Sequence, residues 1–351
     1  MAIKHLVRKN ILALQPYASA RSEFKGTAEV FLDANENPFE SGVNRYPDPL
    51  QWKVKQKISE LKKVAPQHIF LGNGSDEAID LLLRIFCEPR IDEIMILPPT
   101  YGMYKVSAGI ADVTIKEVSL TADFQPDVAA ILAAVSPKTK ILFLCSPNNP
   151  TANDFDRALI LDLIQQFPGI VVVDEAYIDF TQQKSLSLDL AQYENLVVMQ
   201  TFSKAWGLAG IRLGMAFASE EIIHYFNKVK PPYNVNQLSQ NMALEAMNKI
   251  EKQELEVAII LSERAKLIKA LEELDFVEKV FPTSANFILI RVNDALGLYN
   301  QLVEKKIIVR NRSNVHLCEG GLRISVGRPE ENDRLIQVLN QFRHAENLIP
   351  G

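Results

Sequence analysis

The middle of this chain alternates short apolar runs with segments that have the periodicity of helices. The apolar runs predict strands at residues 92–97, 113–118, 140–145, 170–173, 196–200 and 211–217, with helices between most of them, for instance at 126–134 and 154–167. Strands that alternate with helices are typical of a mainly parallel, doubly wound sheet that is covered on both faces. Such sheets bind ligands beyond the carboxyl ends of their strands. We therefore expect an α/β protein with its site at that edge.

A second, smaller unit is predicted after the sheet. A helical region runs from about 234 to 274, with an interruption near 249–253, and a small α+β unit follows. Its strands are predicted near 279–281, 286–292, 306–310 and 322–326, and its last helix at 329–343. We divide the chain into an apolar N-terminal arm (1–30) that covers a partner surface, a large cofactor-binding domain (31–245) and a small domain (246–351). The N-terminal segment is expected to pack with the small domain.

Composition excludes several classes of function. The chain has 351 residues, of which 47% are apolar and 23% charged, as in ordinary soluble globular proteins. Its net charge of −5 and the lack of a basic cluster argue against nucleic acid as a partner. No apolar run approaches the roughly 20 residues that span a bilayer, and no signal-peptide core is present, so we expect a cytoplasmic protein without a membrane partner. Three widely spaced cysteines and five scattered histidines give no support for a metal site.

The segment from Thr201 to Gly214 contains the most specific chemistry in the chain. It follows the apolar run 196–199 and places Lys204 among the hydroxyls of Thr201 and Ser203, with Arg212 eight residues further on. Burial lowers the pKa of an amine and makes it a usable nucleophile and base. Hydroxyl groups and a guanidinium are suitable ligands for a phosphate beside it. The combination predicts pyridoxal 5'-phosphate bound covalently to Lys204.

Four motifs resemble those of the class II, fold-type I aminotransferases. They are Thr201-Phe-Ser-Lys-Ala-Trp-Gly, Ser146-Pro-Asn-Asn-Pro-Thr, Asp174-Glu-Ala-Tyr and Leu322-Arg-Ile-Ser-Val-Gly, and they span nearly the whole chain. Within this class the chain is similar to the histidinol-phosphate aminotransferase family. The resemblance implies a homodimer that reversibly converts L-histidinol phosphate and 2-oxoglutarate to imidazole acetol phosphate and L-glutamate, in histidine biosynthesis.

A phosphate cradle is predicted where the run Ile69–Leu71 is followed by a glycine turn and a helix. Gly74, Ser75 and Asp76 lie at the start of that helix. Exposed backbone N–H groups at a helix N-terminus bind anions, and glycine allows a phosphate to approach closely. The same residues could serve as plain helix caps. The lysine motif elsewhere favours the cradle.

Further cofactor contacts follow the other predicted strands. Asp174 ends an apolar run, and as an anion it would keep the ring nitrogen of the cofactor protonated; a strand-closing cap is the alternative. Asn149 and Tyr177 are expected to donate to the phenolic oxygen of the cofactor, although the segment 149–151 could be just a turn. Tyr101 resembles the aromatic residue that stacks on the ring; a surface tyrosine on a proline-rich loop is the alternative. Ala152 stands where relatives usually have glycine, which would be strained if that position needs a positive φ.

Substrate contacts are expected from two arginines of the small domain. Arg323 resembles the carboxylate-binding arginine of the family, and Arg310 lies thirteen residues before it. An unpaired guanidinium among apolar residues is costly, so this placement favours anion ligands. A second arginine suits a substrate that carries a phosphate. Arg312 and Arg328 are interpreted as solvated.

Three more residues are assigned through the resemblance. Tyr17 would lie over the substrate pocket, although a turn aromatic is the plain alternative. Asn35, in the turn 35–38, is also expected to bind substrate. Tyr46 would cross the dimer interface to the phosphate of the neighbouring subunit's cofactor.

Competing interpretations remain at this stage. A threonine-phosphate decarboxylase or an aromatic-amino-acid aminotransferase of the same fold would use the same cofactor residues. A nucleotide-binding oxidoreductase belongs to another class, and it lacks support because no Gly-x-Gly-x-x-Gly motif follows the first predicted strand.

Overall fold

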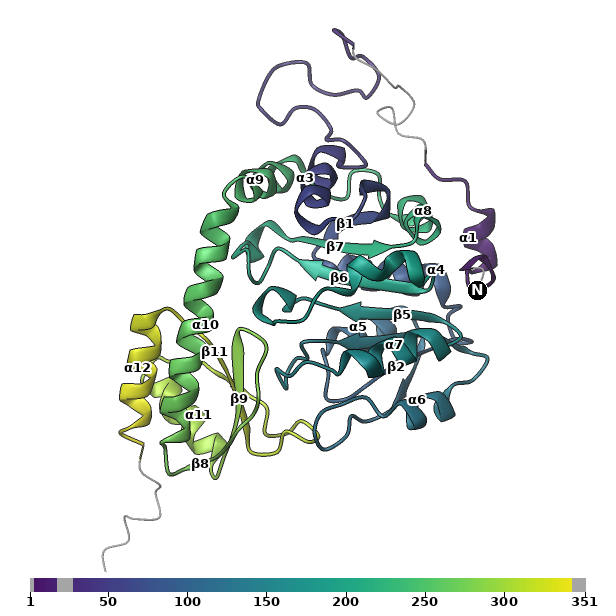
Figure 1. Ribbon diagram of the computed structural model, residues 1–351. Coiled ribbons are helices and arrows are strands. Elements are labelled where there is room, and N and C mark those ends of the chain that lie inside the picture. The colour runs from purple at the N-terminus through teal and green to yellow at the C-terminus, as the bar shows by residue number, and fades with distance from the viewer. Residues whose placement is uncertain (1–2, 18–27, 343–351) are drawn as a thin grey trace, which may run out of the picture.

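Two β-sheets organise the molecule in the computed structural model, which describes residues 3–17 and 28–342 (Figure 1). Parts of the expected arm (1–2 and 18–27) and the last residues (343–351) lie outside this description. The larger sheet occupies the centre of Figure 1, and the smaller sheet lies beside the long helix α10 (Ile250–Glu272).

The larger sheet has seven strands in the order β1-β7-β6-β5-β4-β2-β3. Their bounds are β1 (Ile69–Asn73), β2 (Glu93–Ile96), β3 (Thr114–Glu117), β4 (Thr139–Cys145), β5 (Ile170–Asp174), β6 (Leu196–Thr201) and β7 (Leu213–Ala218). Strands β2 to β6 pair in parallel, whereas β7 is antiparallel to both β6 and β1. The predicted α/β class with a mainly parallel sheet is confirmed.

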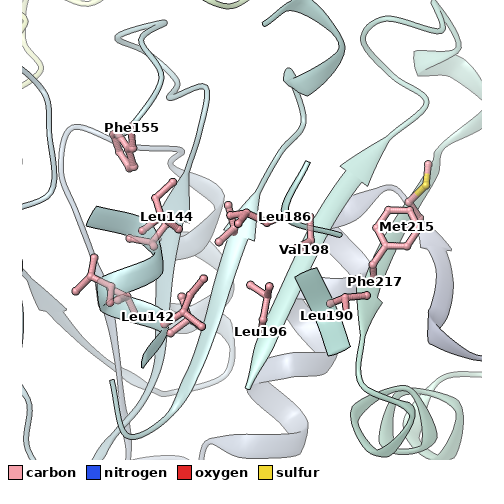
Figure 2. Packing of buried hydrophobic residues seen from close by; sticks show 14 of the residues in the cluster. Leu142, Leu144, Phe155, Leu186, Leu190, Leu196, Val198, Met215 and Phe217 are labelled. Atoms are coloured by element: carbon pink, nitrogen blue, oxygen red, sulfur yellow. The ribbon is translucent and has the colours of Figure 1, made fainter. Parts of the chain in front are cut away.

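Helices cover both faces of this sheet. One face is covered by α4 (Ser75–Phe86), α5 (Met103–Ile110) and α8 (Glu220–Val229), and the other by α3 (Trp52–Lys62), α6 (Val128–Ala134), α7 (Arg157–Gln166) and α9 (Gln237–Met247). Successive side chains of a strand point to opposite faces. In β4, Ile141 and Phe143 therefore enter the core beneath α4, α5 and α8, while Leu142 and Leu144 enter the core on the other face. Figure 2 shows Leu142 and Leu144 in that second core.

The N-terminal segment packs against the large domain, so the prediction that it packs with the small domain is wrong for residues 3–13. Helix α1 (Lys9–Ala13) follows a 3-10 turn at Ile3–His5, and the buried residues Ile3, Val7 and Ile11 join the core beneath α4 and α8. Polar contacts fix the docking, because the backbone N–H of Arg8 donates to Ile85 O at 2.9 Å. The apolar stripe thus covers a surface of its own chain.

The smaller sheet is antiparallel, with strands in the order β10-β11-β9-β8. Its elements are β8 (Val277–Val280), β9 (Phe287–Val292), β10 (Arg310–Asn311), β11 (Gly321–Ser325), α11 (Ala295–Glu304) and α12 (Pro329–Leu339). The predicted strand at 306–310 is wrong except for its last residue. Ile307 N donates to Leu302 O at 2.8 Å, so the chain here still closes the end of α11. Ile307 and Val309 pack against the small core without pairing in the sheet.

The long helical region is two helices, since α9 ends at Met247 and α10 begins at Ile250. The break lies at the start of the interruption that the sequence predicts. The proposed boundary between the large and small domains, at 245/246, falls in the last turn of α9 and stays a prediction.

Candidate active site

A cavity of about 990 Å³ lies at the carboxyl ends of the parallel strands and reaches across to the smaller sheet. Residues of both sheets line it. The predicted site residues among its walls are Gly74, Ser75, Asp76, Tyr101, Asn149, Asp174, Tyr177, Thr201, Ser203, Lys204, Arg212, Arg310 and Arg323. These residues lie far apart in the chain, from Gly74 to Arg323, and the fold brings them to one place.

Lys204 stands in the turn that follows β6. Gly207 N donates to Lys204 O at 3.0 Å, and Gly207 has a φ of 65°, which suits glycine and closes the turn tightly. The side chain is open to the cavity, and its Nζ lies 5.5 Å from the centroid of the Tyr177 ring. Burial by the surrounding walls lowers the pKa of Lys204, and the positive charge of Arg323 lowers it further. The amine is therefore easier to deprotonate than an ordinary lysine.

Asp174 is the last residue of β5 and is only 3% exposed. Two groups of the protein hold its carboxylate. Tyr104 Oη–H donates to Oδ2 at 2.8 Å, and the backbone N–H of Ala176 donates to Oδ1 at 3.1 Å. Burial nonetheless raises the pKa of Asp174 to about 6. A buried carboxylate of this kind is suited to bind a cationic N–H group.

Tyr104 is a contact of Asp174 that the sequence does not predict. Its side chain is fully buried, and its ring stacks on Phe143 with centroids 4.6 Å apart. It also packs edge-on against Tyr101, at 5.5 Å between centroids. The only sequence signal is a second tyrosine three residues after Tyr101, and such a tyrosine is typical of an ordinary core aromatic.

The start of α4 forms a cradle for an anion. Gly74 has a φ of 71° and no side chain caps the helix, while Gly74, Ser75 and Asp76 line the cavity, so the backbone N–H groups of the first turn are suited to bind an anion there. Glycine is favoured here because residues with a side chain rarely adopt a φ of 71°. Two side chains contact the carboxylate of Asp76. Arg212 Nη2 lies 3.5 Å from its Oδ2, and Tyr101 Oη–H donates to its Oδ1 at 3.2 Å.

The hydroxyls of Thr201 and Ser203 complete this side, with their oxygens 3.0 Å apart. Strand β7 packs closely on the start of α4, because a Cβ at Gly214 would lie 2.1 Å from Ser75 N. The strand β7 can therefore approach the helix start only through Gly214.

The opposite wall is formed by the strand pair β10–β11. Arg310 is the cross-strand partner of Arg323, so two positive side chains lie next to each other. Arg323 Nη1 donates to Asn149 Oδ1 at 2.5 Å, and Asn149 Nδ2 donates to Tyr177 Oη at 3.4 Å. Burial lowers the pKa of Arg323. This wall is chemically suited to bind an anion.

Arg312 corrects an expectation. It was interpreted as solvated, but it is half-buried and lines the same cavity. The sequence could not show this, because the placement depends on the short strand β10 and its register with β11. Arg328 is exposed and pairs with Glu330 at 3.1 Å, as expected.

Three predicted site residues do not line this cavity. Tyr17 is 77% exposed. Asn35 and Tyr46 line a second cavity of about 480 Å³, where the ring of Tyr46 stacks on Tyr233 with centroids 4.4 Å apart. Their assigned roles in binding stay predictions.

Ala152 is buried and has a φ of 70°, so the strain that the sequence suggested at this position is present. In residues 3–17 and 28–342, no group of three or more His, Cys, Asp or Glu side chains could hold a metal ion. Nor does any helix in those ranges have the length and apolar character that crossing a membrane requires.

Comparisons with known proteins agree with this geometry. The family model described as aminotransferase class I and II matches residues 20–339. Histidinol-phosphate aminotransferase of Parabacteroides distasonis is 53% identical over 341 residues, which cover 97% of this chain and 99% of that protein.

Solved structures give the same fold. The histidinol-phosphate aminotransferase of Clostridium acetobutylicum superposes with a TM-score of 0.79 at 23% identity, covering 88% of this chain and 92% of that one. The Sinorhizobium meliloti histidinol-phosphate aminotransferase, in complex with pyridoxal-5'-phosphate, has a TM-score of 0.77 at 21% identity and covers 85% and 83% of the two chains. The chain belongs to the aminotransferase class I and II family, and it is an enzyme that transfers amino groups.

Proposed function

We propose that this aminotransferase binds pyridoxal 5'-phosphate at Lys204 and reversibly transfers the amino group of L-histidinol phosphate to 2-oxoglutarate, a step of histidine biosynthesis. One observation carries the proposal. The Lys204 amine, with its lowered pKa, lies in a cavity that has an anion cradle on one wall and paired arginines on the other.

The residues present fit the cofactor. The first turn of α4, Arg212 and the hydroxyls of Thr201 and Ser203 would hold its phosphate, and the buried Asp174 would hold its protonated ring nitrogen. The φ of 71° at Gly74 favours glycine, so this corner of the cavity, next to Arg212, carries no side chain. These are the donors and the acceptor that the charges of the cofactor require.

Tyr101, Asn149 and Tyr177 surround the space between these two ends. We assign Tyr101 to the face of the cofactor ring and the two others to its phenolic oxygen. The hydrogen bond from Asn149 Nδ2 to Tyr177 Oη, at 3.4 Å, keeps the pair together. When bound, the cofactor supplies an electron sink that acidifies the hydrogen on the carbon bearing the amino group.

Lys204 is assigned as the general base and acid of the reaction. Its Nζ takes the proton from the carbon that bears the amino group, and the lowered pKa increases the fraction of free amine available for this. Asp174, held by Tyr104 and Ala176 N, keeps its charge fixed in place while the proton moves.

The wall that carries Arg310 and Arg323, here called the arginine wall, is assigned to the anionic end of the substrate. Arg323 and Arg310 would share the phosphate of histidinol phosphate, and Arg323 would hold a carboxylate of glutamate or 2-oxoglutarate. Two guanidiniums that face each other are balanced when an anion lies between them. The name of the Parabacteroides relative, which is 53% identical, supports the same substrate.

We also propose a homodimer. Leu32 and Phe39 are 89% and 80% exposed on the segment 28–47, and an exposed apolar segment of this kind marks a contact surface. An ion pair between Arg45 Nη1 and Glu36 Oε2, at 2.8 Å, orders the segment. Tyr46 lies on the same segment, and we assign it to the cofactor phosphate of the partner. Sedimentation velocity tests the dimer, and a monomer at micromolar concentration would contradict it.

A cytoplasmic location completes the proposal. It is supported by the cysteines Cys87, Cys145 and Cys318, which are free and buried, as suits a reducing compartment.

Two measurements test the proposed reaction. Borohydride treatment and peptide mapping should place a pyridoxyl group on Lys204, and labelling of another lysine alone would contradict the assignment. Histidinol phosphate and 2-oxoglutarate should yield glutamate. Release of carbon dioxide from threonine phosphate, without glutamate formation, would instead favour the decarboxylase of the same fold.

A further inference from the structure

Three arginines share one face of the β10–β11 strand pair. Arg310 and Arg312 are two residues apart, which places their side chains on the same face of an extended chain. Arg323 lies opposite Arg310 on β11, and all three line the active-site cavity. The alternate residue Leu322 points the other way and is fully buried in the core of the smaller sheet.

Arg312 lies opposite a position that has no side chain. Its backbone N–H donates to Gly321 O at 2.8 Å, which continues the register of the strand pair. A Cβ at Gly321 would lie 2.4 Å from Cys318 O, so only glycine fits there. No cross-strand side chain therefore pairs with Arg312.

The guanidinium of Arg312 has an unused donor. Its Nε is buried, and no group within the described residues accepts a hydrogen bond from it. A buried donor without an acceptor destabilises a fold. Burial lowers the pKa of Arg312, and the positive charges of Arg323 and Arg310 lower it further. The charged guanidinium is therefore unfavourable at this place unless a negative charge lies near it. A purely structural arginine would have an acceptor from its own chain.

We propose that Arg312 selects substrates that carry a phosphate monoester over substrates that carry only a carboxylate. The proposal rests on the proposed function and adds a residue to it. A carboxylate has two oxygens and one charge, which Arg310 and Arg323 satisfy. A phosphate monoester has three terminal oxygens and a charge of about −1.5 to −2 at pH 7, so it offers a third acceptor and balances a third guanidinium.

The test compares the two half-reactions by stopped flow in Arg312→Gln. Losing one charge-assisted hydrogen bond should lower kcat/KM for histidinol phosphate by about 10- to 100-fold. The half-reaction with glutamate should change by less than about threefold, since its carboxylate is satisfied without Arg312. Equal losses in both half-reactions, or no loss in either, would overturn the proposal.

Two further variants serve as controls. Arg334→Gln removes an exposed arginine of α12, which bonds to Gln337 at 2.8 Å, and should leave both half-reactions unchanged. Arg312→Lys keeps the charge but loses the planar fork, so its selectivity should fall between the parent and Arg312→Gln. If Arg312→Gln does not fold, Arg312→Lys decides the proposal, and parent-like selectivity for phosphate would then overturn it.

Inhibition by inorganic phosphate separates this inference from the proposed function. With the cofactor bound, the inhibition constant for phosphate in the glutamate half-reaction should rise about 10-fold in Arg312→Gln. If the parent does not use histidinol phosphate, the proposed function fails and this constant alone decides the inference. Equal constants in the parent and Arg312→Gln would overturn it.

Discussion

The two walls of the cavity differ in whether the protein itself supplies hydrogen-bond partners to their charged side chains. On the wall formed by the larger sheet, the buried carboxylate of Asp174 accepts hydrogen bonds from Tyr104 and from the backbone of Ala176. On the wall formed by the smaller sheet, Arg310 faces Arg323, and the Nε of Arg312 has no acceptor within the described residues. The protein's own groups hold the first wall. On the second wall Arg323 bonds to the neutral side chain of Asn149, and we propose that an anionic ligand balances the charges of the arginines.

We relate this difference to the two kinds of ligand in the proposed reaction, the cofactor and the substrates. In the proposed reaction the cofactor is common to both half-reactions, so a wall held by the protein's own contacts, here called the fixed wall, serves it throughout. The proposed substrates alternate between a phosphate ester and a dicarboxylate, so the other wall would bind anions of different size. Arginine side chains with few bonds to their own chain can do so, because their donors remain available to the substrate.

The largest effect is expected on the fixed wall, from Lys204→Ala. Removing the general base should lower kcat for transamination by at least about 10²- to 10⁴-fold. Steady-state assays measure this, with Lys138→Ala as an exposed-lysine control. A loss below tenfold would show that another group moves the proton.

Asp174→Asn tests whether the carboxylate is strained by burial. Burial raises the pKa of Asp174 from its ordinary value of 3.8 to about 6, so Asp174 contributes stability below about pH 4 that is lost as pH rises through 6. The loss is about 3 kcal/mol for a shift of about two units. Urea unfolding of cofactor-free protein should show it between pH 4 and 7 in the parent and not in Asp174→Asn. Parallel pH profiles would contradict the burial of a charged group.

On the arginine wall, Arg323→Ala and Arg310→Ala should cost about 1.5–3 kcal/mol each, or about 10- to 150-fold in kcat/KM. Arg323→Ala should impair both half-reactions, while Arg310→Ala should impair that of histidinol phosphate more. Arg323→Ala should also move the lysine-dependent limb of the pH–rate profile to higher pH, because Arg323 lowers the pKa of Lys204. Stopped-flow kinetics of each half-reaction measures all three effects. A limb at the same pH in the parent and in Arg323→Ala would show that Arg323 does not lower the pKa of Lys204.

The smallest effect is expected from Tyr104→Phe, which removes one hydrogen bond to Asp174. This bond lowers the pKa of Asp174, so its loss should raise the midpoint of the pH-dependent stability change. A rise of up to about one pH unit corresponds to about 1.4 kcal/mol. An unchanged midpoint would show that Ala176 N alone holds the carboxylate.

Much of the fixed wall could be predicted from the sequence. Its strands are apolar runs bounded by turns, and Asn149, Asp174 and Lys204 each follow such a run. Parallel strands end at one edge, so the position of a residue along the chain is enough to place it there. Tyr104 was missed because a tyrosine within a helix is usually part of the core.

The arginine wall was harder to predict. The apolar residues Ile307 and Val309 suggested a strand, but they pack on the small core without pairing. The role of Arg312 depends on its register with Gly321, and no single-chain pattern encodes a register across a nine-residue loop (312–320). The N-terminal stripe had the right spacing, but spacing does not say which surface it covers; Ile3 and Val7 pack on the large domain.

Single-turnover reaction of the parent enzyme with histidinol phosphate and with histidinol tests the division between the walls most directly. Both substrates present the same amine to Lys204 and differ only in the phosphate that the arginines would bind. The account predicts that kcat/KM favours histidinol phosphate by at least about 10²-fold, from two or more charge-assisted interactions. A ratio near one would contradict it, because the arginine wall would then have no part in binding the substrate.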